Sequence, residues 1–271
     1  MIDILTYIPE KLLPVVKSIW CLRVSKEGNT HYTEDILPDG HHEIIFHLEE
    51  KTARRSNDAT NWITEPDAFF AGQTLKNYSL ELQRNSLLYG IRFHPHTLNL
   101  LFKFPVYEIT NKILPLCDIP EAKLLRDCIT ETPALTFQKL ENTLLRLCEK
   151  TDLSEQKFRY IDFSVQEILK TKGVISIDKL VSGTGLSQRY FDTIFRQTVG
   201  INPKPFCNII RLNHFINFKN TYPEKKLTEC CYESGFFDQS HLIKTFLAVT
   251  NRLPAEYFRT PNLINNYFSE M

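Results

Sequence analysis

The sequence predicts an α+β protein with a sandwich or small barrel of β-strands first, a helical connector, and an all-α domain last. Three observations favour this architecture. Short apolar runs separated by turn residues fill residues 1–115, which is typical of β-strands. Amphipathic segments follow in residues 116–156, with the spacing of helices. A helical pattern that repeats itself occupies residues 157–260, before a short tail at 261–271.

The composition is that of an ordinary globular protein, but the charge is unevenly distributed. The 271 residues are 42% hydrophobic and 24% charged, and the formal net charge is zero. Residues 157–260 hold 15 Lys and Arg against 9 Asp and Glu, a net charge of +6. Residues 1–156 hold 17 against 22, a net charge of −5. This asymmetry fits a nucleic-acid-binding domain joined to a domain with another role.

Cysteine usage and the first residues favour a cytoplasmic protein. The seven cysteines are odd in number and show no C-x-x-C spacing, so they indicate neither a disulfide framework nor a zinc site. Cys230 and Cys231 would point about 100° apart on a helix, and we expect them to fill a core. Residues 1–20 contain acids and prolines, unlike a secretory signal. No apolar run reaches the ~18–20 residues of a membrane span.

Most of the β-structure is expected in residues 1–115. The predicted strands are residues 19–24, 42–48, 68–71, 78–82 and 87–93, and the predicted turns are Gly28-Asn29 and Leu37-Pro38-Asp39-Gly40. Pro and Gly stand in the second turn where a β-turn favours them. Residues 49–60 offer little to bury and are expected to form a polar loop. The strand spacing suggests a sandwich or small barrel.

Residues 96–150 are expected to be mainly helical. A short helix at 97–102 is ended by Pro105, and two amphipathic helices follow at 121–128 and 135–148. These two helices either pair with their copies in a second chain, forming a homodimer, or pack on the β domain. Residues 152–156 then form a polar link to a helix at 158–170.

The C-terminal part contains two similar units. Their matching patterns are Phe195-x4-Gly200-x2-Pro203-x2-Phe206 and Phe246-x4-Asn251-x2-Pro254-x2-Tyr257. Matches at one fixed offset indicate a repeated supersecondary unit. Each unit is predicted to be two helices joined by a tight turn, at Gly185 and Gly235 respectively. A long helix opened by Pro203 and reaching about residue 218 joins the units.

The second helix of each unit exposes a polar face. In the first unit, Ser187 is expected to cap the helix, which buries Ile194, Phe195 and either Tyr190 or Phe191. The exposed face follows from the spacing i, i+4 and i+7, which places together Arg189, Thr193 and Arg196. In the second unit, the exposed residues are Gln239, Ser240, Ile243 and Lys244.

Residues 158–259 resemble the DNA-binding domain of the AraC/XylS family of bacterial transcription regulators. The most specific segment is Gly235-Phe236-x-Asp238-x-Ser240-His241-x3-Thr245-Phe246, followed by Pro254-x2-Tyr257 and Arg259. The departures from the family pattern are Cys230-Cys231 for Ile-Ala, Leu247 for a basic residue, and Asn251 for glycine. Because Asn tolerates positive φ better than other non-glycine residues, the last change is expected to be mild.

A second resemblance concerns the N-terminal half. The segments are Leu37-Pro38-Asp39-Gly40-x3-Ile44-Ile45-Phe46, Gly72, and Gly90-Ile91-Arg92-Phe93-x-Pro95. They resemble a sensor domain, related to cupin-like barrels, that precedes some AraC-type regulators. The resemblance implies a small-molecule effector. If the barrel holds a cavity, Arg92 is the first candidate to bind the ligand. The alternative is a solidly packed domain that only dimerises.

The resemblance also implies a double-stranded DNA operator, and RNA polymerase as a partner if the protein is an activator. Recognition helices about 34 Å apart can enter successive major grooves. The expected base contacts are Arg189, Asp192, Thr193, Arg196, Gln239, Ser240 and Lys244. An arginine side chain can donate hydrogen bonds to the guanine edge, and a glutamine side chain can hydrogen-bond the adenine edge. Asp192 would accept a hydrogen bond from cytosine N4 or orient a neighbouring arginine. The expected phosphate contacts, near helix N-termini, are Ser187, Asn202 and Lys204; Ser240 is also near such an end.

Two enzyme hypotheses compete with the regulator. A cupin-type metalloenzyme with an accessory DNA-binding module would need ligands from the histidines His41, His42, His47, His94 and His96. Pro95 interrupts their strand, and neighbouring strand residues point to opposite faces. Turn and surface histidines without a metal or other cofactor are therefore favoured. A DNA-repair activity would need a reactive cysteine in a defined context, which the sequence does not offer. We expect no catalytic residues.

Overall fold

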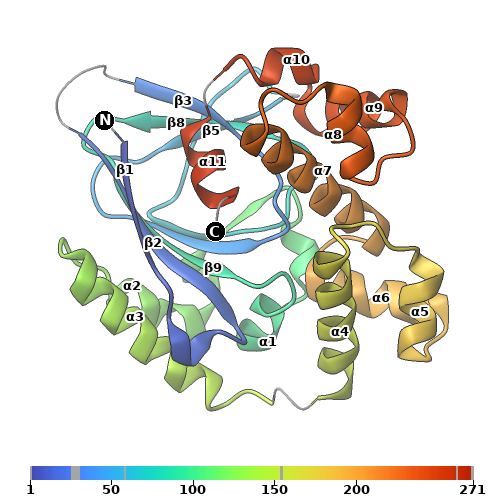
Figure 1. Ribbon diagram of the computed structural model, residues 1–271. Helices are drawn as coiled ribbons and strands as arrows, with labels where there is room; N and C mark the ends of the chain where they lie inside the picture. The colour runs from blue at the N-terminus through green and yellow to red at the C-terminus, as the bar shows by residue number, and fades with distance from the viewer. Residues whose placement is uncertain (1, 26–30, 58, 153–154, 261, 270–271) are drawn as a thin grey trace.

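The computed structural model describes residues 2–25, 31–57, 59–152, 155–260 and 262–269. The predicted turn at Gly28-Asn29 lies outside these ranges. Strands gather on one side of the molecule and the helices of the C-terminal half on the other (Figure 1). The predicted α+β class is confirmed.

The strands of the described residues form two antiparallel sheets. The larger sheet has the order β1 (Ile2–Tyr7), β2 (Val16–Val24), β9 (Leu87–Phe93), β4 (His42–His47), β7 (Ala68–Ala71) and β10 (Ile113–Pro115). The smaller sheet has the order β3 (His31–Ile36), β8 (Tyr78–Gln83), β5 (Ala53–Ser56) and β6 (Ile63–Thr64). The β-rich half predicted from the turn-separated apolar runs is thus a two-sheet sandwich.

The central strands of the larger sheet are buried on both faces. Ile19 and Ile91 face a core covered by helices, whereas Trp20, Leu22 and Leu88 face the smaller sheet. Strands covered on both sides are expected to be continuously apolar, and β9 is buried along its whole length. This explains why β2 and β9 were recognisable as apolar runs.

The prediction of a polar loop at residues 49–60 is wrong at its centre. Residues 53–56 form β5, which pairs with β8. The strand is stabilised by contacts of its arginines with aromatic rings and not by buried apolar side chains. The Arg54 guanidinium lies 3.9 Å from the ring centroid of Tyr78, and the Arg55 guanidinium lies 4.7 Å from the ring centroid of Trp62. Such cation–π contacts depend on partners distant in sequence, so the local pattern did not reveal the strand.

Helices cover the outer face of the larger sheet. They are η1 (Glu10–Leu12), α1 (Leu98–Phe102), η2 (Val106–Ile109), η3 (Leu116–Asp118), η4 (Pro120–Ala122), α2 (Lys123–Arg126) and α3 (Pro133–Cys148). Phe137, Leu140 and Leu144 of α3 belong to the same core as Ile19 and Ile91. The connector helices therefore pack on the β domain. Dimerisation through their outer side stays a prediction.

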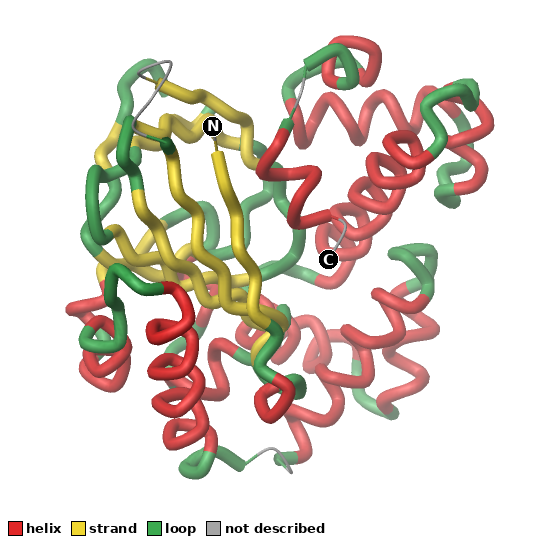
Figure 2. The backbone as a smooth tube through the Cα atoms, turned by 60° about the vertical axis from the view of Figure 1, so that its left-hand side comes forward, coloured by secondary structure: helices red, strands yellow, loops and turns green. Residues whose placement is uncertain are grey.

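The C-terminal half is helical throughout. It contains α4 (Gln156–Lys170), α5 (Ile177–Thr184), α6 (Gln188–Val199), α7 (Pro203–Thr221), α8 (Leu227–Glu233), α9 (Gln239–Thr250), α10 (Pro254–Tyr257) and α11 (Leu263–Ser269). One core lies among α4 to α7 and another among α7 to α10. The helix α11 was not predicted in the tail; it lies against the β-sandwich, between the sheets and the other helices (Figure 2). None of the helices described is long and apolar enough to cross a membrane.

Candidate functional site

The first helix-turn-helix unit consists of α5 and α6. Gly185 ends α5 at φ 69°, a backbone conformation that favours glycine. The Ser187 hydroxyl then accepts a hydrogen bond from the Tyr190 N–H at 3.4 Å, so the predicted cap is confirmed. Phe191 is fully buried whereas Tyr190 is 42% exposed, which decides between the two alternatives for the apolar face of α6.

The second unit, α8 and α9, follows the same plan. Gly235 makes the turn at φ 72°, and the Asp238 carboxylate caps α9 by accepting from the His241 N–H at 2.7 Å. Asn251 ends α9 at φ 55°, so it takes the left-handed conformation expected of the family's glycine. Cys230 and Cys231 are fully buried in the core of this unit.

The predicted contact residues lie on α6, on α9 and at the start of α7, and all but Asp192 are exposed. Fully on the surface are Ser187, Arg189, Thr193, Arg196, Asn202, Lys204, Gln239, Ser240 and Lys244. Asp192 is half-buried. The Arg196 guanidinium lies 5.0 Å from the ring centroid of Tyr107, in η2 of the other domain. One residue of the recognition face is therefore engaged by the β domain in this conformation.

The long helix α7 joins the two units. It has 19 residues, and at 1.5 Å per residue it is about 28 Å long. Pro203 stands in its first turn, where the missing N–H has no cost. Because α7 contributes to the cores of both units, it sets the distance between them.

The β domain holds the C-terminal ends of both recognition helices. At the end of α6, His42 Nε2 donates to the Val199 carbonyl at 3.0 Å, and Thr110 Oγ1 donates to the Gly200 carbonyl at 2.7 Å. At the end of α9, the Asn77 N–H donates to the Val249 carbonyl at 2.8 Å. These contacts fall at the C-terminal end of the second helix in each unit, so the β domain braces both.

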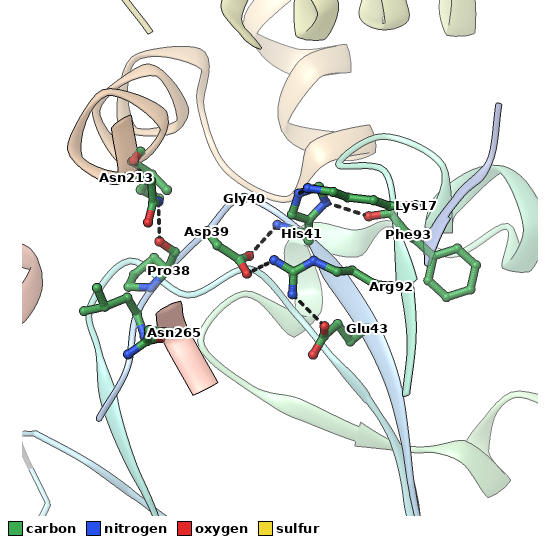
Figure 3. A network of polar contacts seen from close by, with 12 residues as sticks. Lys17, Pro38, Asp39, Gly40, His41, Glu43, Arg92, Phe93, Asn213 and Asn265 are labelled. Carbon is green, nitrogen blue, oxygen red and sulfur yellow. Dashed lines mark hydrogen bonds and ion pairs between the residues drawn. The ribbon is translucent and has the colours of Figure 1, made fainter. Parts of the chain in front are cut away.

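A cavity of about 310 Å³ lies between the two sheets and α7. Its size is at the small end of ligand sites. The apolar wall is formed by Trp20, Leu22, Ile36, Ile45, Leu80, Leu82, Leu88, Ile210, Ile264 and Phe268. The polar end contains Arg92, which donates to Glu43 at 2.8 Å and also to Asp39 (Figure 3). Arg92 thus lies where a ligand-binding residue was predicted, but its charge is already paired.

Strand register explains why these charges meet. Glu43 of β4 stands opposite Arg92 of β9, and both side chains point to the face between the sheets. Lys17 lies where the pairing of β2 and β9 shifts between Val16 and Ser18; such a bulge re-aims a side chain. Lys17 Nζ donates to His41 Nε2 at 3.4 Å.

The helix α11 closes one side of the cavity. The Glu34 carboxylate accepts from the Leu263 and Ile264 N–H groups at 3.1 and 2.9 Å. Phe268 lies 4.9 Å from the Arg92 guanidinium and meets the Trp20 ring edge to face at 5.5 Å. No motif marked α11, Lys17, Glu43 or Phe268 as parts of a site, because each is brought there by pairing with a distant segment.

The five histidines considered as metal ligands have separate roles. His41, His42 and His94 each donate to a backbone carbonyl, of Phe93, Val199 and Leu13 respectively. His47 contacts the Pro66 carbonyl and Thr52, and His96 lies 3.1 Å from Asp162 of α4. Within the ranges described, no three His, Cys, Asp or Glu side chains are placed to hold a metal ion.

Comparisons with known proteins agree with this division of the chain. Residues 6–115 match a domain of unknown function (DUF6597), and residues 180–260 match a helix-turn-helix domain. No curated protein gives a significant match.

Several solved structures match over most of the chain, with low sequence identity. ToxT from Vibrio cholerae is 14% identical, with 95% of this chain and 98% of that chain covered and a TM-score of 0.45. ToxT with an unsaturated fatty acid bound is 14% identical, with 85% and 95% covered and a TM-score of 0.43. The AraC-like transcriptional activator CuxR is 13% identical, with 83% and 88% covered and a TM-score of 0.29.

The assignment of a helix-turn-helix domain depends on the C-terminal half. There, a helix-turn-helix match coincides with two capped units joined by one long helix and with the AraC-type motif around Gly235 and Pro254. The chain therefore carries a helix-turn-helix domain in its C-terminal half, preceded by a β-rich domain that matches a domain of unknown function.

Proposed function

We propose that the chain is an AraC-type transcription regulator that reads two successive major-groove segments of an operator with α6 and α9, under the control of a small molecule in the cavity. One observation supports the coupling between the cavity and the helical domain. Along the segment 37–43, Asp39, His41 and Glu43 line the cavity. Intervening residues hold the helical domain: Pro38 accepts from Asn213 of α7 at 2.7 Å, and His42 donates to the end of α6.

The same segment thus contacts both a ligand and a recognition helix. Gly40 strengthens this link, because a Cβ there would come within 2.9 Å of Phe206 in α7. A ligand that displaces Asp39 or His41 would therefore move α6 and α7. A ligand shifts such an equilibrium only by its differential affinity for the two arrangements, and contact with this segment supplies that difference.

For DNA recognition, we propose base contacts from Arg189, Thr193 and Arg196 on α6, with Asp192 orienting an arginine. On α9 the proposed base contacts are Gln239, Ser240 and Lys244. Phosphate contacts come from Ser187, Asn202 and Lys204. Support for the base contacts comes from the exposure of these side chains on α6 and α9, and support for the phosphate contacts from their places at the N-terminal ends of α6 and α7. On binding DNA, Arg196 would leave the Tyr107 ring and enter the major groove.

We place the regulator in the cytoplasm and assign it no catalytic role. Two further partners are a second copy of the chain and RNA polymerase. The seven cysteines are free thiols, as a reducing compartment requires. A homodimer would use the outer side of the connector helices, where Leu124 is 60% and Leu135 42% exposed. RNA polymerase would be contacted if the regulator activates transcription.

The test compares two single substitutions in the full chain. An operator is first isolated by in-vitro selection. Arg189→Ala should weaken operator binding by about 1–3 kcal/mol and relax discrimination at only one or two base pairs, since one side chain reads one base edge. Lys204→Ala should weaken binding to every sequence alike and lower the salt slope by about one. Affinities are measured by fluorescence anisotropy on operator variants and at several salt concentrations.

The matched control is Lys179→Ala, an exposed substitution on α5 of the same unit, which should leave affinity and discrimination unchanged. Exposed helix substitutions usually change stability by less than ~0.5 kcal/mol, so all three proteins should unfold alike. An even loss of affinity across all sequences for Arg189→Ala would make Arg189 a phosphate contact and refute the groove assignment.

A further inference from the structure

The cavity offers an apolar body and a compact polar end. Most of the wall residues are aliphatic or aromatic, so a bound molecule would bury an apolar surface there. The polar side chains cluster around Arg92, which is 4% exposed. This guanidinium is bounded by Asp39, by Glu43 and, on its face, by the Phe268 ring.

The charges at this polar end cancel. Arg92 and Lys17 contribute two positive charges, and Asp39 and Glu43 contribute two negative charges, all within one network (Figure 3). His41 donates from Nδ1 to the Phe93 carbonyl at 2.9 Å, so its Nε2 accepts from Lys17 as a neutral ring. Burial first, and then the charges of Arg92 and Lys17, hold the pKa of His41 well below its usual value.

The other ionisable groups on the wall do not disturb this balance. Glu65 lies 3.7 Å from Arg54, which compensates its charge. Lys172 is exposed, so solvent screens it. From α7, the wall receives neutral hydrogen-bonding side chains, including Asn213 and His214.

We propose that the cavity selects an amphipathic molecule with an apolar body and an uncharged hydrogen-bonding head, such as a hydroxyl or an amide. This inference rests on the proposed ligand control. An anionic head would add a third negative charge beside Asp39 and Glu43, and a cationic head a third positive charge beside Lys17 and Arg92. A charge buried without a partner is costly, whereas a hydroxyl or an amide needs only hydrogen bonds.

The test uses three probes that share one body: 4-phenylbutanol, 4-phenylbutanoate and 4-phenylbutylamine. Binding to the full chain is measured by isothermal titration calorimetry at pH 7.5. The alcohol should bind at least tenfold more tightly than either charged probe. The Glu43→Gln substitution removes one negative charge at nearly constant shape. The network of Arg92, Lys17 and Asp39 is then left with a net positive charge. The carboxylate should then gain at least tenfold in affinity, and the amine should lose affinity.

The matched control is Glu50→Gln, an exposed carboxylate outside the cavity, which should preserve the wild-type order of the probes. If the wild-type chain prefers the carboxylate or the amine, the inference is overturned while ligand control stands. If none of the three probes binds, the cavity does not take such amphipathic molecules, and the inference is overturned. Operator binding without any ligand is measured separately, so the DNA-binding function is judged independently.

Discussion

His42 shows how one buried side chain connects the two domains. It lies on β4 with no exposed surface, and its Nε2 donates to the last turn of α6. Gly200 is favoured as a glycine at this contact because its φ is 94°, a backbone conformation that residues with a Cβ rarely adopt. The side chain that was weighed as a metal ligand therefore connects the β domain with α6.

The buried His42 side chain is expected to make the free energy of unfolding depend on pH. Burial lowers the pKa of His42 from 6.5 to about 4, although the bond to Val199 opposes the shift. The unfolded chain therefore binds a proton at His42 below pH ~6.5 while the folded chain does not. The free energy of unfolding should fall as the pH drops from about 6.5 to 4, with a contribution from His42 of about 3 kcal/mol at the lower end.

The measurement is urea unfolding at pH 7.5 and pH 5 for the wild type and two variants. His42→Gln keeps a donor for Val199 but does not titrate, so it should lose less stability on acidification than the wild type. His241→Gln, at an exposed position on α9, serves as the control and should behave like the wild type. Identical pH dependence in His42→Gln and the wild type would contradict the assignment.

At the scale of elements, α11 depends on its contacts. It has seven residues, too few for a helix that is stable alone. Its order comes from the Glu34 carboxylate, from Asn265, which accepts from the Leu37 N–H at 3.0 Å, and from Phe268. The element that closes the cavity is therefore held in place by tertiary contacts with the β domain.

Phe268→Ala should release α11 and open the cavity. We expect faster amide hydrogen exchange in α11 and a more solvent-accessible Trp20, measured by mass spectrometry and by iodide quenching of fluorescence. Because Phe268 is only half-buried, the loss of stability should be smaller than the ~3–5 kcal/mol of a fully buried Phe. The control Leu263→Ala, at 53% exposure on the same helix, should change neither signal. Unchanged exchange in Phe268→Ala would show that α11 does not depend on this ring.

At the scale of the whole molecule, a part of the chain with net negative charge contacts a part with net positive charge. Arg252 at the end of the second unit pairs with Asp35 of the β domain at 2.7 Å. The net charge of −5 on residues 1–156 lies beside the +6 of residues 157–260. Since phosphate contacts dominate affinity for non-specific DNA, the β domain should weaken such binding through repulsion.

Residues 157–260 alone should therefore bind non-specific DNA more tightly than the full chain. Both should show a log–log salt slope of several units. Circular dichroism must first establish that the isolated domain is folded, because it lacks Leu37, which contributes to the core of the second unit. Equal affinities of two folded proteins at low salt would refute the electrostatic argument.

The sequence by itself determined the features that depend on neighbours along the chain. The cap Ser187, the turns at Gly185 and Gly235, and the left-handed Asn251 involve contacts within a few residues, so their spacing was sufficient to predict both helix-turn-helix units. Apolar runs were likewise sufficient for β2 and β9, because these strands are buried on both faces.

Only the tertiary structure decided which side chains line the cavity of the β domain and how this domain contacts the helical domain. Glu43 and Arg92 meet through the register of β4 with β9, and Lys17 joins them through a bulge. Phe268 reaches the same cavity from the far end of the described chain. Strand pairing and domain docking depend on the packing of many segments that are distant in sequence. A local sequence pattern therefore does not identify which distant segment will be the partner.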